Sequence, residues 1–157
     1  MSTKPEQSPL SFVAPIKAPV PENYKALKEI LETGTFGTAL DQIGTVHFGR
    51  FMFLEKVTPE SGEEYYAKFA LFTAYDGDFQ KYVDDFVAVV SDFFNAVLVH
   101  LENAEGLIPV QKDSEAFADY IKKYNQPVKV WYSAYPTLSV VKIRGSIHFW
   151  QKHSNSK

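Results

Sequence analysis

Two stretches of this sequence decide its fold: residues 45–54, TVHFGRFMFL, and residues 65–75, YYAKFALFTAY. In both stretches apolar side chains occupy odd and even positions alike, whereas a strand with one face in water alternates apolar and polar residues. Pro59 and Gly62 lie in the connector between them, where they favour a turn. The sequence therefore predicts a long β-hairpin that is covered on both of its faces.

The segments around this hairpin complete an α+β order. In chain order the expected elements are a strand at 10–16, a helix at 21–31, a Thr/Gly-rich loop at 33–38, the hairpin, a long helix at 79–101 capped by Asp78, a shorter helix after 113–114, and a strand at 128–133. Residues 137–150 fit either a strand or a helix, and we expect a helix. We expect a single domain over residues 10–150, with a disordered stub at 1–9 and a frayed tail at 151–157.

This order is βαββαβ with one helix inserted and one appended at the C-terminus, which is the ferredoxin-like arrangement. Helices in that arrangement lie on one face of an antiparallel sheet. Because the other face is apolar here as well, we expect a second copy of the same sheet to cover it, which predicts a homodimer.

The composition excludes several classes of protein. The chain has 157 residues, enough for one domain, and its 45% of apolar residues is a globular value. The absence of cysteine excludes disulfide scaffolds and sulfur-ligated zinc sites. A net charge of −3 supplies no basic face for nucleic acid. The first residues lack the apolar core of a secretory signal, and residues 86–101 are too short and too polar to cross a membrane, so we expect a cytoplasmic protein.

Three segments together resemble a known group of proteins. They are GTVHFGRF at 44–51, LFTAYDGDF with YVDDF at 71–86, and VWYSAYPTLSV at 130–140. This pattern resembles that of an uncharacterised bacterial group of ferredoxin-like, dimeric α/β-barrel proteins, in which an HFAR strand precedes a YDGS turn and a YSAYP segment. Gly49 and Asp78 replace the Ala and the Ser of that pattern. The resemblance spans residues 10–144. It implies a fold shared with cofactor-free monooxygenases, muconolactone-isomerase-like enzymes and haem-dependent dye-decolorising peroxidases, and it implies no particular activity.

His47, Arg50 and Asp76 are the candidate catalytic residues, because they are ionisable groups within otherwise apolar strands. On an inner sheet face, His47 would serve as a general base or as an axial haem ligand, or simply as a core histidine with both ring nitrogens hydrogen-bonded. Strand parity turns Arg50 to the other face, toward the helices. There it would pair with Asp76, Asp84 or Asp85 and tie the sheet to a helix, or form with Asp76 a polar pocket that binds an anionic substrate or activates peroxide.

Aromatic residues are the candidates for ligand contacts. Gly49 shares a face with His47 and leaves space there for a ligand or for a neighbouring ring. Several aromatic residues lie near strand ends, where they would wall a pocket for a flat apolar ligand; packing in a dimer interface explains them equally well. The candidate ligand-binding residues are Phe51, Tyr75, Trp131, Tyr132 and Tyr135.

Two functions remain open at this point. The first is a small-molecule oxidoreductase, monooxygenase-like or peroxidase-like, with a pocket between sheet and helices near His47. The second is a non-catalytic binding or accessory module whose polar residues are structural. Haem is compatible with the first function and required by neither. No metal-binding spacing such as HExxH and no phosphate-binding loop occurs, so we expect no metal site. The expected partners are a second copy of the chain and a small apolar or aromatic ligand, with neither nucleic acid nor membrane.

Overall fold

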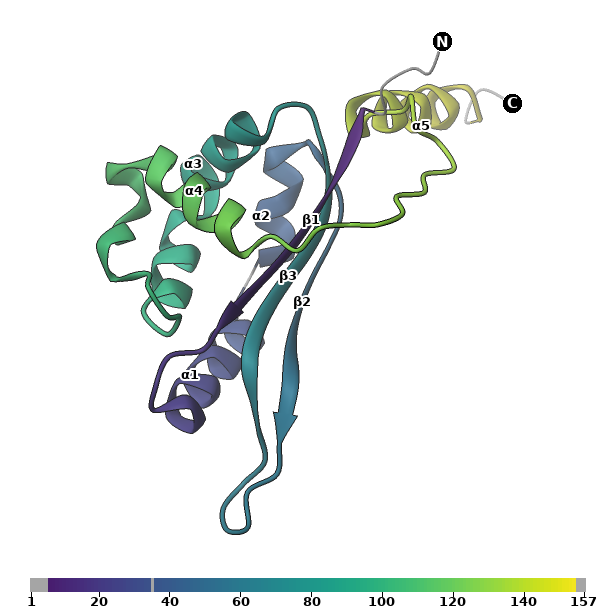
Figure 1. Cartoon of the computed structure of the whole chain (residues 1–157). Helices are drawn as coiled ribbons and strands as arrows, with labels where there is room; N and C mark the ends of the chain where they lie inside the picture. The colour runs from purple at the N-terminus through teal and green to yellow at the C-terminus, as the bar shows by residue number, and fades with distance from the viewer. Residues whose placement is uncertain (1–5, 35, 155–157) are drawn as a thin grey trace.

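The predicted hairpin forms two of the three strands of an antiparallel sheet. The computed structural model describes residues 6–34 and 36–154. In it, β2 (Val46–Val57) pairs with β3 (Tyr65–Asp76), and β1 (Gln7–Pro15) pairs with the other edge of β3. The strand order is therefore β1-β3-β2, with the second strand of the hairpin in the centre (Figure 1).

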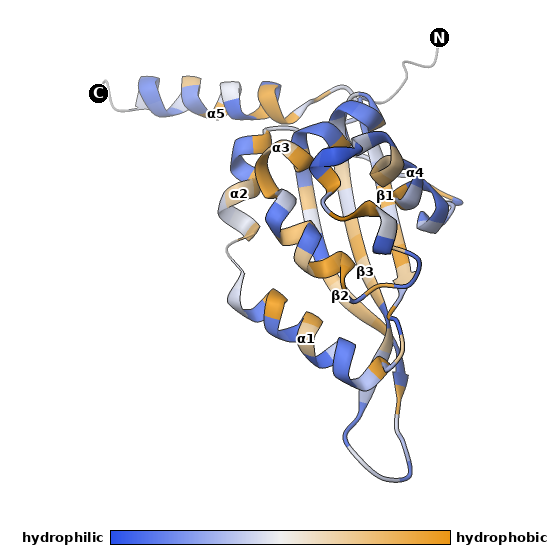
Figure 2. Cartoon of the chain, turned by 90° about the vertical axis from the view of Figure 1, so that its left-hand side faces the viewer, coloured by the Kyte–Doolittle hydropathy of each residue, from blue (hydrophilic) through white to orange (hydrophobic). Residues whose placement is uncertain are grey.

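Four helices form a layer against one face of this sheet: α1 (Val20–Thr33), α2 (Phe36–Ile43), α3 (Phe79–Leu98) and α4 (Ser114–Tyr124). Two short 3-10 turns, η1 (Glu105–Leu107) and η2 (Val110–Lys112), connect α3 to α4. Figure 2 looks onto this layer, behind which the strands are mostly apolar. A fifth helix, α5 (Val140–Ser154), lies at the end of the sheet on the side opposite the other four (Figure 1).

The hydrophobic core lies between the sheet and the four helices. Alternate residues of β1 and β3 point into it, and α3 and α4 supply the opposing side chains, as the helical spacing of their apolar residues predicts. The largest fully buried side chains are Ile16, Leu27, Phe69, Val83, Val97, Leu101, Val110 and Phe117. The predicted cap of α3 is confirmed, because the Asp78 carboxylate accepts a hydrogen bond of 3.0 Å from the backbone N–H of Lys81.

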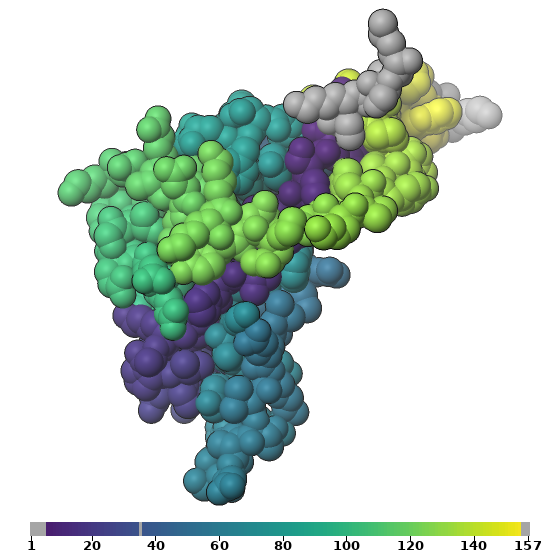
Figure 3. Space-filling model, viewed as in Figure 1, coloured from purple at the N-terminus to yellow at the C-terminus, as the bar shows by residue number. Residues whose placement is uncertain are grey.

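The predicted strand at 128–133 does not form, and the molecule is neither a complete ferredoxin-like βαββαβ unit nor a barrel. The chain just before this segment does lie beside β1, as a fourth strand would, because Gln126 donates its backbone N–H to the Ser11 carbonyl at 2.8 Å. Continuing the register of the Phe12–Asn125 bridge would place Pro127 opposite Leu10 and Val128 opposite Pro9. In this register the backbone groups of residues 9 and 11 face residues 126–128. Pro9 has no N–H to donate, and the Ser11 N–H is bonded to the Asn125 side chain at 2.9 Å, so the ladder does not continue. Residues 126–139, here called the strap, instead pass over β1 toward α5 (Figure 3).

Other boundaries also differ from the expectation. The loop expected at 33–38 gives way to α2 from Phe36 onward, because Phe36, Leu40 and Ile43 recur at helical spacing and contact the core. The ambiguous segment at 137–150 is helical in α5, as expected. Residues 1–5 of the expected stub and 155–157 of the expected tail lie outside the described residues, whereas Gln7–Pro9 belong to β1 and residues 151–154 to α5.

The sheet face turned away from α1–α4, here called the open face, is not covered by any of these four helices (Figure 1). It carries Phe48, Arg50, Met52 and Leu54 of β2 opposite even-numbered residues of β3 such as Phe72. The Phe48 side chain is 78% exposed. The sequence is therefore right that both faces of the hairpin are apolar, but the chain covers only one of them. Among residues 6–34 and 36–154, no helix is long and apolar enough to cross a membrane.

The core position of Phe117 gives a first prediction. Phe117→Ala should lower the free energy of unfolding by about 3–5 kcal/mol, because the side chain is 2% exposed and its removal leaves a cavity beneath the sheet. Urea unfolding followed by circular dichroism measures this change. Val99→Ala is the control, since Val99 follows the end of α3 and is 46% exposed. Equal losses in the two variants would contradict the assignment of the core.

Candidate functional site

A β-bulge sets the orientation of side chains along β2. Val46 pairs with Tyr75 and Phe48 pairs with Ala74, so His47 is an extra residue on β2. Beyond the bulge, Gly49 faces the helices and Arg50 faces the opposite way. The space above Gly49 is not a void, because a Cβ there would lie 3.6 Å from Thr73 Cγ2 and 3.7 Å from Leu40 Cδ1.

The bulge brings His47 to Asp76. His47 Nε2 lies 2.7 Å from Asp76 Oδ1, and the two side chains are only 6% and 11% exposed. The second carboxylate oxygen, Oδ2, accepts a hydrogen bond of 2.7 Å from the backbone N–H of Val140, the first residue of α5. Asp76 therefore joins the bulge of β2 to the start of α5, and both of its oxygens are engaged. This arrangement is that of a buried structural pair.

Arg50 is separate from this pair, and the expected contact between Arg50 and a carboxylate on the helices does not form. Its guanidinium carbon lies 5.3 Å from the centre of the Phe72 ring on the open face. Its three candidate partners make other contacts. Asp76 is bonded to His47. The Asp84 carboxylate accepts a hydrogen bond of 3.0 Å from the Gln80 side-chain amide, and the Asp85 carboxylate lies 2.8 Å from Lys81 Nζ. Within the described residues, Arg50 makes no ion pair. Because the sheet is apolar on both sides, its sequence pattern did not reveal which face the helices would take.

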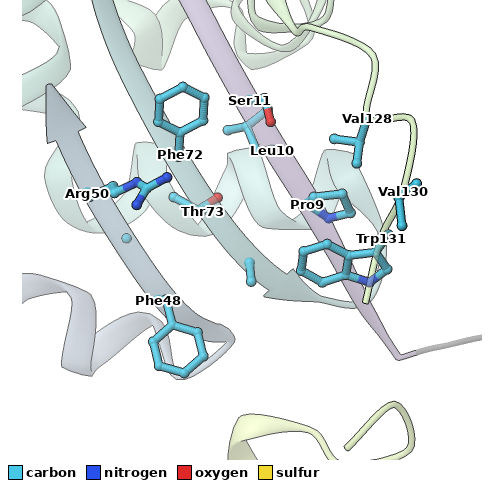
Figure 4. A pocket seen from close by; sticks show the side chains of 12 residues that line it. Pro9, Leu10, Ser11, Phe48, Arg50, Phe72, Thr73, Val128, Val130 and Trp131 are labelled. Atoms are coloured by element: carbon cyan, nitrogen blue, oxygen red, sulfur yellow. The ribbon is translucent and has the colours of Figure 1, made fainter. Parts of the chain in front are cut away.

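A cleft of about 430 Å³ lies beside Arg50 on the open face (Figure 4). β1, β2, β3 and the strap all contribute to its wall, and Arg50 is the one charged residue in it. The lining residues are Pro9, Leu10, Ser11, Phe48, Gly49, Arg50, Phe72, Thr73, Ala74, Val128, Val130 and Trp131. The cleft is open to solvent and its wall is mostly apolar, which suits a small organic ligand.

Trp131 is the one residue among the five aromatic candidates that lines this cleft. Phe51 faces the helices, with its ring centre 4.6 Å from that of Phe36. Tyr75 stacks on Tyr82 at 4.2 Å in the core, where burial raises the pKa of both phenols. Tyr132 and Tyr135 lie on the strap and are 81% and 65% exposed.

The space between the sheet and the helices, where the sequence placed a pocket, is almost completely filled. The cavity bounded by β1, β3, α3 and α4 measures about 20 Å³, room for about one water molecule and far below the roughly 300 Å³ of a small ligand site. The Tyr82 hydroxyl reaches the Thr73 hydroxyl at 2.8 Å and so has a partner. The phenylalanines of the helical layer pack against each other; Phe94, for example, contacts Phe86 and Phe117.

His47 does not fit the role of an axial haem ligand. Its Nε2 is held by Asp76, and its side chain is almost completely buried. No histidine lines the open-face cleft. Among residues 6–34 and 36–154, no group of three or more His, Cys, Asp or Glu side chains is arranged to hold a metal ion.

Gln7 positions the strap, and sequence reasoning missed this role because it assigned Gln7 to a disordered stub. Its Nε2 donates to the carbonyls of Tyr135 and Leu138 at 3.1 and 3.0 Å, and its Oε1 accepts from the Ser133 hydroxyl at 2.9 Å. One side chain thus fixes the far end of the strap to the start of β1. No local pattern signals this role, since the partners are more than 120 residues away.

The bridge made by Asp76 gives a second prediction. Asp76→Ala should lower the free energy of unfolding by roughly 1–3 kcal/mol, because it leaves the buried His47 ring and the Val140 N–H without an acceptor. It should also release α5, so that trypsin cleaves after Lys142 and Arg144 about fivefold faster or more. Limited proteolysis with mass spectrometry measures the rate. Asp84→Ala is the control, since Asp84 is exposed and bonds within its own helix; unchanged cleavage in Asp76→Ala would refute the bridge.

A scan against protein-family models, a search of curated proteins and a search of solved structures each give no match to this chain. The site is therefore interpreted from its own geometry.

Proposed function

We propose that this protein is a homodimeric module that binds a small apolar or aromatic molecule in the cleft on its open face. The observation that carries the proposal is the cleft itself. Its volume of about 430 Å³ falls within the range of roughly 300–1,000 Å³ typical of ligand sites. Its wall presents the rings of Phe48, Phe72 and Trp131, and the Trp131 side chain remains 40% exposed. Exposed rings gathered around a hollow are unfavourable in water unless something covers them.

The geometry favours binding over catalysis. An oxidoreductase would need His47 or Asp76 within reach of a bound substrate, and neither side chain lines the cleft. Both are held in the bridge to α5. Thr73 lines the cleft, but its hydroxyl is bonded to Tyr82. We therefore assign the polar groups around the bulge a structural role within this proposal.

The partner in this proposal is a second copy of the chain. Twelve large hydrophobic side chains are exposed among the described residues, and all except Val99 belong to β2, the strap or α5. Exposed apolar residues gathered in this way indicate an interface. A two-fold axis would cover the open face and the apolar residues of α5 in one self-complementary contact, and the cleft would then lie between the two copies.

The cleft is tested by the fluorescence of Trp131. In a Trp150→Phe background, which leaves Trp131 as the one tryptophan, the neutral probe N-phenyl-1-naphthylamine should quench Trp131 in a saturable way. Val130→Glu should raise the dissociation constant about tenfold, because it places a charge in the apolar wall. Tyr132→Glu is the matched control, since Tyr132 is equally exposed on the strap but does not line the cleft. Absence of saturable quenching, or equal effects of the two variants, would refute a ligand site here.

The dimer is tested by light scattering at micromolar concentration, which should give twice the mass of one chain. Phe48→Asp should shift the protein to monomers, because it places a carboxylate in the middle of the proposed interface. Val99→Asp introduces the same charge at an exposed apolar residue away from that surface and should leave the dimer intact. A monomeric wild-type protein would contradict the proposed partner while leaving the cleft unaffected.

A further inference from the structure

We propose that the cleft on the open face is selective for a flat aromatic molecule that carries an anionic group, such as a carboxylate, and that Arg50 binds this group. This inference rests on the proposed binding function and specifies the ligand of the same site. The observation behind it is the charge of the wall: among twelve lining residues there is one cation, Arg50, and no acidic residue.

The guanidinium of Arg50 is available to an incoming anion. Elsewhere on the hairpin, cations are already neutralised: Lys56 lies 2.6 Å from Glu64, and Lys68 lies 2.6 Å from Glu55. Arg50 has no such partner among the described residues, and its described contact is with the ring of Phe72. An anion that enters the cleft therefore does not have to displace a protein carboxylate.

The contact with Phe72 also orients the guanidinium. A cation above a ring is attracted by the electron-rich face of that ring, and this attraction holds the Arg50 head group over β3 rather than free in solvent. A guanidinium has five N–H donors in its own plane, which match the two oxygens of a carboxylate or the oxygens of a phosphate. Figure 4 shows the Arg50 head group beside Phe72 and Thr73, with space between it and Trp131.

The remainder of the wall selects a flat apolar body. Phe48 and Phe72 come from the sheet and Trp131 comes from the strap on the other side of the cleft (Figure 4). Aromatic rings bind other flat rings through stacked or edge-to-face contacts. Thr73 Oγ1 is already bonded to Tyr82, so it does not compete with Arg50 for the anionic group. The wall thus combines apolar surface for the ring system with one cation for its acidic substituent.

The test uses three probes of one shape and different charge: naphthalene-2-carboxylate, naphthalene-2-carboxamide and naphthalene-2-carboxamidinium. Each is titrated into the Trp150→Phe protein at pH 7 while Trp131 fluorescence is recorded. The dissociation constant of the carboxylate should be at least about tenfold lower than that of the neutral carboxamide, which is the gain expected of a charge-assisted hydrogen bond. The amidinium should bind most weakly.

Arg50→Gln should abolish the preference for the carboxylate and leave the dissociation constant of the carboxamide within about twofold. Lys68→Gln removes a positive charge from the same hairpin outside the cleft and should keep the preference. Binding of the carboxamide without any preference for the carboxylate would overturn this inference and leave the proposed binding function standing. A preference that survives Arg50→Gln would overturn it too, because the anion would then be bound by another group. Failure of all three probes would contradict the binding function itself.

Discussion

The structure depends on one constraint: a three-stranded sheet that is apolar on both faces receives helices on only one of them. The helical layer removes Phe69, Leu71 and their neighbours from water, and this burial supplies the hydrophobic free energy of the fold. The opposite face keeps Phe48 and Phe72 close to solvent, with the strap as its one cover from the described chain. The cleft, the exposed cation and the proposed dimer are all consequences of this unequal coverage.

The electrostatics of the site follow from how the bulge at His47 divides the ionisable groups. His47 and Asp76 come together where the strands are well covered, and their contact has the short distance expected of a charge-assisted hydrogen bond. Arg50, three residues further along β2, lies opposite Phe72 on the open face, away from this pair. The three residues that looked like one constellation therefore perform two separate tasks: one pair positions α5, and one cation remains at the surface. The division arises because Asp76 lies at the end of β3 beside the bulge, whereas Phe72 lies four residues earlier on the same strand.

The parts of the fold that sequence reasoning predicted are those with a long, regular hydrophobic period. The hairpin, α3 with its Asp78 cap and α4 all have such a period, and the structure confirms them. The predicted strand at 128–133 was wrong for a reason that its own residues do not show, since Pro9, which interrupts the ladder, lies on β1. In the site, the sequence singled out His47 and Asp76 but paired Asp76 with Arg50, because it gave no sign of the bulge that brings His47 to Asp76. The cleft could not be predicted, because it depends on where the strap lies, and a glutamine near the N-terminus fixes that position.

The strap has a consequence for how broadly the proposed site would recognise ligands. It is attached near Gln126 by the backbone of β1 and near Ser133 by Gln7, while the described structure records no hydrogen bond from residues 127–132 to the sheet. Three sides of the cleft are thus formed by β1, β2 and β3, and the fourth is formed by the strap, which is attached near its two ends. A wall attached at its two ends would adjust the width of the proposed site without unfolding any element. Molecules of different thickness would then share one anchoring point, so that the proposed site would discriminate the charge of a ligand more strictly than its thickness.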